Sequence, residues 1–214
     1  MAPADSARVV LVHGLWMNGF AMLPLAWRLQ RCGFRVTRHG YKSVSRGLSE
    51  NAQLLARTCE INGASNNDPL HLVGHSLGGL VIMAMLQQHA YIPVRRVVLL
   101  GTPYASSAAA HGLGRFTWGS GMLGHTLGDW LQQPRPQVPE GIELGVIAGD
   151  IPFGLGRLFV RLPGSNDGVV KLDETRVPGA ADSVVLRTSH SAMLVSQAVA
   201  RATCVFLKGG RFKQ

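Results

Sequence analysis

The feature that most constrains the fold is a series of short apolar runs separated by helix-like segments. Four of the six runs are almost continuous in Val, Leu and Ile instead of alternating with polar residues. Such runs suit strands that are covered on both faces, as in a parallel sheet. The six expected strands are residues 8–14, 35–41, 70–76, 95–101, 144–150 and 183–189.

Helical patterns fill the spaces between these runs. Ser49 is a plausible N-cap for the second of them. Strands that alternate with helices form βαβ units, so the pattern predicts an α/β sheet with right-handed crossovers. The expected helices are residues 20–33, 47–61, 77–90 and 191–207.

The chain of 214 residues, 46% of them hydrophobic, suits a single domain that spans 1–214. Residues 104–140 interrupt the rhythm, because they carry no strand signal and are rich in Gly, Ala and Pro. Their one periodic part is a short helix candidate at about 122–131. The segment is interpreted equally well as a lid over a site or as a solvated excursion.

The net charge of +9 is the compositional feature that bears on partners. Lys and Arg are scattered, and no run mixes basic with aromatic residues, so we expect a basic surface and no nucleic-acid binding. Attraction to anionic lipid would be loose, and no apolar stretch is long enough to span a membrane.

Compartment is predicted from the N-terminus and the cysteines. The start, "MAPADSARVVLVHG", lacks the pattern of a signal peptide. Cys32, Cys59 and Cys204 are an odd count without metal-ligand spacing, which favours unpaired thiols in a reducing compartment. A cytoplasmic location is therefore expected.

The strongest candidate for chemistry is Ser76, in "HLVGHSLGGL" (71–80). It stands where a buried strand ends and an apolar helix begins, and Gly74 and Gly78 allow a sharp turn there. The turn would present the hydroxyl at the carboxyl edge of the sheet, with a helix N-terminus beside it. A simple helix N-cap is the competing interpretation.

A nucleophilic serine needs a base, and the base needs a group that orients it. Of eight histidines, only His190 follows the last strand and precedes the last helix. A sequentially wound sheet brings that loop to the same edge as Ser76. The loop after the fifth strand offers Asp150 and Asp167, and position alone does not separate them. Asp167 is also compatible with an ordinary Asp-Gly turn.

The turn after the first strand completes the constellation. Backbone N–H groups of Leu15 and Leu77 would lie on either side of a carbonyl bound above Ser76 and form an oxyanion hole. The apolar residues on loops at this edge are candidates for an acyl pocket, with core packing as the alternative. These residues are Trp16, Met17, Tyr104 and Phe153.

With these residues in place, the chain resembles the α/β-hydrolases, and within them the small serine esterases and lipases. The matching stretches are "VHGL" (12–15), "GHSLGG" (74–79), "LLGTPYASS" (99–107), "NDGVV" (166–170) and "TSH" (188–190). The resemblance implies a minimal, six-stranded, mainly parallel sheet with helices on both faces and a short lid-like insertion. It also favours Asp167 over Asp150 as the acid.

The resemblance further implies ester hydrolysis through an acyl-enzyme on Ser76, with no metal or organic cofactor. The short insertion favours an open site, and so an esterase over a long-chain lipase. An acyltransferase with the same triad and a non-catalytic binding module are the alternative functions. The expected partner is a small ester substrate.

Overall fold

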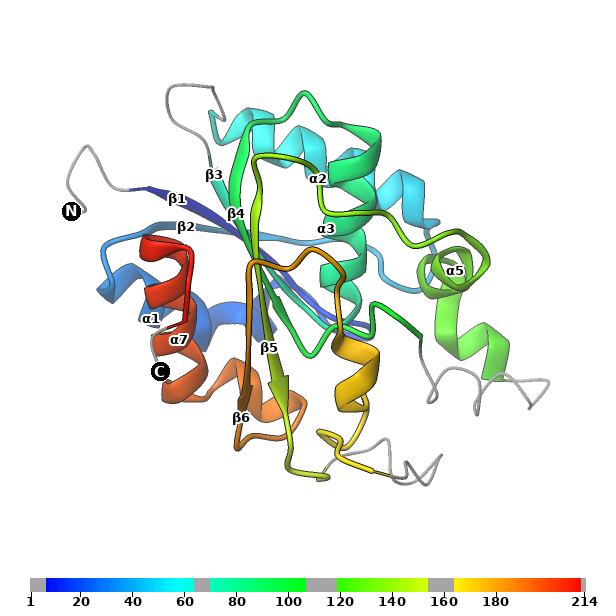
Figure 1. Cartoon of the computed structure of the whole chain (residues 1–214). Helices are drawn as coiled ribbons and strands as arrows, with labels where there is room; N and C mark the ends of the chain where they lie inside the picture. The colour runs from blue at the N-terminus through cyan, green and yellow to red at the C-terminus, as the bar shows by residue number, and fades with distance from the viewer. Residues whose placement is uncertain (1–6, 64–69, 107–118, 154–163, 213–214) are drawn as a thin grey trace.

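Six parallel strands form one sheet in the order β2-β1-β3-β4-β5-β6 (Figure 1). The structure is a computed structural model that describes residues 7–63, 70–106, 119–153 and 164–212. The predicted parallel α/β sheet is confirmed, each strand begins within one residue of its expected start, and the last strand ends three residues before its expected end. The strands are β1 (Arg8–Val12), β2 (Arg35–His39), β3 (Leu70–His75), β4 (Val94–Leu100), β5 (Glu143–Gly149) and β6 (Asp182–Leu186).

Both faces of the central strands are buried, which explains their continuous apolar sequences. In β1, Val10 and Val12 join one hydrophobic cluster, whereas Val9 and Leu11 join the cluster on the opposite face. Successive side chains of a strand point to opposite faces, so every position of a strand covered on both faces is buried, which favours apolar residues.

Helices cover each face. On one face lie α1 (Leu23–Arg31), which continues from a 3₁₀ turn at Gly19–Met22, and α7 (Gln197–Gly209) (Figure 1). The other face is covered by α2 (Leu48–Ile61), α3 (Leu77–Gln88) and α5 (Gly119–Gln132).

Two expected helix starts were wrong. Helix α2 begins at Leu48 with Gly47 as N-cap, so Ser49 lies inside the first turn. The Asp129 carboxylate of α5 accepts the Leu48 N–H at 2.8 Å, and this contact between distant segments cannot be read from local sequence. The last predicted helix is divided into a 3₁₀ turn at Ser191–Leu194 and α7, which Ser196 caps.

The described part of the 104–140 segment is built into the core. Trp130 of α5 is fully buried, and its ring meets Tyr104 edge to face. The Thr126 hydroxyl donates to the carbonyl of Arg46 and accepts from the Asn51 amide, so α5 is bonded to α2 and to the loop before it. A solvated excursion is therefore wrong for this part. Residues 107–118, including Trp118, lie outside the described residues, and a lid there stays a prediction.

The prediction of three unpaired cysteines was wrong. Cys32 at the end of α1 and Cys204 of α7 form a disulfide, with Cα atoms 6.4 Å apart. Cys59 is the free cysteine of the described chain, and burial raises the pKa of its thiol to about 12. The pairing joins residues 172 positions apart, which no local pattern reveals. Disulfides are typical of oxidising compartments, so the cysteines no longer support a cytoplasmic location.

None of the helices in the described residues has the length and apolar character that a membrane span requires.

Candidate active site

Ser76 occupies a strained turn between β3 and α3. Its backbone has φ 53° and ψ −123°, a region that side chains other than glycine rarely adopt. In the described chain only Trp16 shares a positive φ among non-glycine residues, and it follows Leu15, the predicted oxyanion residue. Strained residues cluster at functional sites because the surrounding structure must hold them in place.

Glycines allow the nucleophile turn to pack closely. A Cβ on Gly78 would collide with the carbonyl groups of Val12 and His13, and one on Gly74 would lie 2.6 Å from the Gly79 backbone. Both contacts are with backbone, which has little freedom to move aside. The glycines of this motif therefore hold the N-terminus of α3 against the end of β1.

The loop after β1 lies beside Ser76. A Cβ on Gly14 would come within 3.1 Å of the Ser76 Cβ. The N–H groups of Leu15 and Leu77 donate no hydrogen bond within the described residues, which leaves both amides for a ligand oxygen. Their role as an oxyanion hole stays a prediction, but this edge of the sheet offers unsatisfied donors.

Hydrogen bonds and ring stacking of His13 stabilise this loop. Its Nδ1–H donates to the carbonyl of Gly14 at 2.9 Å, and its Nε2 accepts the Tyr41 N–H at 3.3 Å. The Tyr41 ring stacks on the imidazole at 4.4 Å, and its hydroxyl donates to the His13 carbonyl. Burial lowers the pKa of His13, which favours the neutral ring that this pattern requires.

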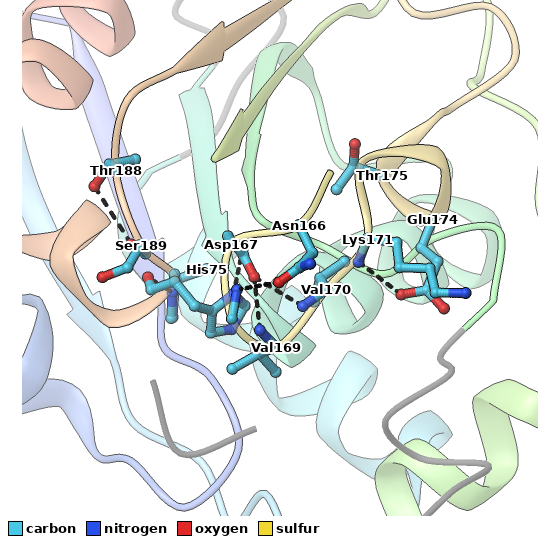
Figure 2. A network of polar contacts seen from close by, with 12 residues as sticks. His75, Asn166, Asp167, Val169, Val170, Lys171, Glu174, Thr175, Thr188 and Ser189 are labelled. Atoms are coloured by element: carbon cyan, nitrogen blue, oxygen red, sulfur yellow. Dashed lines mark hydrogen bonds and ion pairs between the residues drawn. The ribbon is translucent and has the colours of Figure 1, made fainter. Parts of the chain in front are cut away.

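Asp167 and His190 form a buried pair. His190 Nδ1–H donates to Asp167 Oδ2 at 2.7 Å, and the His190 N–H donates to the Asp167 carbonyl at 2.9 Å. The other carboxylate oxygen, Oδ1, accepts the N–H groups of Val169 and Val170 at 3.0 and 2.7 Å (Figure 2). Asp167 therefore makes the turn expected of an Asp-Gly sequence and also orients a histidine.

The two candidate acids have different surroundings. Asp150 follows β5 directly but is exposed, and no described contact joins it to His190. Gly101, at the end of β4, makes room for the pair with a positive φ of 54°. A Cβ there would lie 3.0 Å from Asp167 Oδ2 and 3.1 Å from His190 Nδ1.

His75 links the turn that carries Ser76 to the loop that carries His190, and it was not predicted from sequence. Its Nε2–H donates to the carbonyl of His190 at 3.0 Å, and the two rings are 4.8 Å apart. Figure 2 shows it beside Asp167. Burial, and then the nearby His190, lowers the pKa of His75 to about 3, so the ring stays neutral. Nothing in the sequence marks it, since it stands at the variable position before the serine.

The predicted pocket residues are placed differently from one another. Tyr104 lies in the core, where its hydroxyl donates to the carbonyl of Pro136, so the structure gives it a packing role. Met17 is partly buried against the α1 side of the core. Trp16 is exposed on the loop after β1. Phe153 is also exposed, and its backbone lies against Gly168, the residue after Asp167.

The described residues contain no group of His, Cys, Asp or Glu that could hold a metal ion.

Comparison with known proteins identifies related sequences and folds. A curated relative, the carbendazim hydrolyzing esterase of Nocardioides sp. (strain SG-4G), is 34% identical over 90 residues. These are 39% of this chain and 37% of that enzyme, so the match spans little more than a third of the relative's length.

Two solved structures share the fold at low sequence identity. The mature lipase BlEst2 of Bacillus licheniformis has a TM-score of 0.74 and 20% identity, covering 97% of this chain and 93% of that one. The pyrethroid hydrolase PytH has a TM-score of 0.68 and 15% identity, with coverage of 96% and 98%. The model of the Alpha/beta hydrolase family matches residues 9–202, and the chain therefore belongs to the α/β-hydrolase family.

Proposed function

We propose that this protein is a serine hydrolase that cleaves carboxylic esters, with Ser76 as nucleophile, His190 as base and Asp167 as orienting acid. The observation that carries the proposal is the buried Asp167–His190 pair at the sheet edge where Ser76 lies on a strained turn. Along the chain the nucleophile Ser76, the acid Asp167 and the base His190 follow one another in the order found in α/β-hydrolases.

The hydrogen bonds of Asp167 support these roles. Asp167 holds the proton of His190 on Nδ1, which leaves Nε2 as the free base for the serine hydroxyl. Ser76 attacks the ester carbonyl, and its proton passes to His190. Asp167 stabilises the imidazolium that results. The Leu15 and Leu77 amides, with the N-terminus of α3, stabilise the oxyanion.

Collapse of the tetrahedral intermediate breaks the bond to the alcohol, and His190 gives that alcohol its proton. The acyl group is then an ester of Ser76. His190 next takes a proton from water, the hydroxide attacks the acyl carbon, and the proton returns to Ser76 as the acid leaves. The esterase name of the curated relative supports an ester as the substrate.

The test is hydrolysis of p-nitrophenyl esters of increasing acyl length by the wild type, Ser76→Ala and Ser49→Ala. Ser49→Ala is the matched control, because it removes an exposed hydroxyl of α2 that donates to the Gln88 side chain. We expect Ser49→Ala to keep full activity and Ser76→Ala to lose all activity above background. Equal activity of Ser76→Ala and the wild type would contradict the proposal. Added alcohol that captures the acyl group would identify the acyltransferase alternative.

A further inference from the structure

The first helical segment is apolar on the side that faces the solvent. Phe20, Leu23 and Trp27 follow one another at intervals of three and four residues, and their exposed fractions are 70%, 45% and 55%. Residues with this spacing share one side of a helix. The side of the same segment that faces the core packs without these three residues, since Met22 and Leu29 there are fully buried. The fold does not explain the outer apolar stripe.

Arginines flank this stripe. The Arg31 guanidinium lies 4.7 Å from the centre of the Trp27 ring, and that of Arg38 lies 5.4 Å from the centre of the Phe20 ring. Phe20, Leu23, Trp27, Arg31 and Arg38 together are named the α1 face. An exposed apolar group with cationic neighbours is typical of a binding surface.

The stretch of sequence that contains the α1 face has no acidic residues. Between Asp5 and Glu50 the chain contains no Asp or Glu but seven basic residues. Helix α7, which packs beside α1, carries Arg201 and Lys208 and no acidic residue. The seven basic residues are Arg8, Arg28, Arg31, Arg35, Arg38, Lys42 and Arg46.

The opposite side of the molecule differs. Ile61 and Tyr91 are also exposed there, but Glu60 lies among them and accepts the Tyr91 hydroxyl at 2.9 Å. Glu50 on the same helix, α2, pairs with Arg46. Exposed apolar residues thus occur on both sides, but Phe20 and Trp27 contact arginines whereas Tyr91 contacts a glutamate.

We propose that the α1 face docks the protein onto an anionic lipid surface. Aromatic side chains partition into the headgroup region, and arginines bind lipid phosphate, so this combination matches a negatively charged bilayer in both respects. Docking is peripheral and needs no spanning helix. The inference goes beyond the proposed function and does not depend on it.

Docking on this face brings the candidate site close to the lipid. Trp16, exposed at 52%, lies four residues before Phe20 on the loop that also carries Leu15. The first 3₁₀ turn begins at Gly19, so the chain passes directly from the candidate oxyanion loop into the α1 face. A lipid-bound molecule would therefore hold this edge of the sheet near the membrane surface.

The test measures binding of the full chain to large vesicles of phosphatidylcholine, with and without phosphatidylglycerol. Sedimentation gives the affinity, and quenching by brominated lipid reports insertion of tryptophan. We expect binding to the phosphatidylglycerol vesicles that weakens with salt. Phe20→Ser with Trp27→Ser should weaken it by about tenfold. Removal of charge by Arg31→Gln or Arg38→Gln should weaken it by about fivefold for each arginine.

Matched controls lie on α2 and beside it. Ile61→Ser with Tyr91→Ser removes as many exposed apolar side chains, and Arg57→Gln removes one exposed charge. Both variants should bind as the wild type does. The proposal is overturned if the wild type ignores both kinds of vesicle, or if the controls lose as much affinity as the α1-face variants. It is also overturned if the wild type is a dimer that Phe20→Ser with Trp27→Ser converts to a monomer.

Discussion

The two halves of the candidate site are built by different physical means. The nucleophile half depends on backbone: Ser76 has a positive φ, glycines allow close approach, and the described residues offer the Ser76 hydroxyl no hydrogen bond. The acid–base half depends on side-chain hydrogen bonds, three of which are accepted by the Asp167 carboxylate. One half is strained and the other is satisfied, so substitutions in them should have different consequences.

The largest expected effect is on activity, from the acid–base half. Asp167→Asn should lower kcat/KM by about 10⁴-fold, because an amide no longer holds His190 in the tautomer that leaves Nε2 free. Asp150→Asn is the control and should retain activity, since Asp150 is exposed. Steady-state ester hydrolysis checks both. If Asp150→Asn were the damaging change, the acid would be misassigned.

The close packing of the nucleophile half predicts a large loss of stability. Gly78→Ala should lower the free energy of unfolding by about 3 kcal/mol, because the new methyl group meets the Val12 and His13 carbonyls. Gly128→Ala, in α5, meets nothing within 4 Å and should raise it by about 0.5–1 kcal/mol. Urea denaturation measures both, and equal effects would show that the close approach at Gly78 is unimportant.

Acid should destabilise the nucleophile half through His75. The folded protein keeps this ring neutral to about pH 3, whereas the unfolded chain takes up a proton below about pH 6.5. Stability from this group is therefore complete above pH 6.5 and declines as the pH falls toward 3, by about 2 kcal/mol at pH 5.

The variant His75→Gln isolates this contribution. It should be less stable than the wild type at pH 7, because the bond to the His190 carbonyl is altered, but its stability should fall less between pH 7 and pH 5. Urea denaturation at the two pH values gives both slopes. Parallel slopes would mean that His75 does not titrate differently in the folded and unfolded states.

The smallest expected change in stability within the site is an increase, at the nucleophile itself. Ser76→Gly should abolish activity and raise the free energy of unfolding by about 1 kcal/mol, because glycine adopts a positive φ without strain. Thermal unfolding and ester hydrolysis of the same variant check both parts. A lower stability would mean that the serine side chain contributes packing that outweighs the strain.

The halves also differ in how far sequence predicts them. The nucleophile turn is contiguous, so the glycines around Ser76 and the strand before it identify it from ten residues. Asp167 and His190 are 23 residues apart, and residue position left Asp150 as an equal candidate until the family resemblance favoured Asp167. His75 was missed because its partner, the His190 carbonyl, is a backbone atom 115 residues away.

The same reason explains the other differences. Apolar runs specified all six strands, and in β1, β3, β4 and β5 burial on both faces leaves a nearly continuous local signature. The Cys32–Cys204 disulfide, the Asp129 contact that starts α2 and the burial of Trp130 all join distant segments. None of them leaves a local pattern, and only the assembled fold shows them.

Labelling with a fluorophosphonate, measured as intact mass, tests the central claim most directly. The wild type should gain one adduct, Ser76→Ala should gain none, and His190→Ala should react far more slowly because the serine lacks its base. A folded wild type that stays unlabelled, or a Ser76→Ala variant that gains the same adduct, would contradict the assignment of Ser76 as the nucleophile.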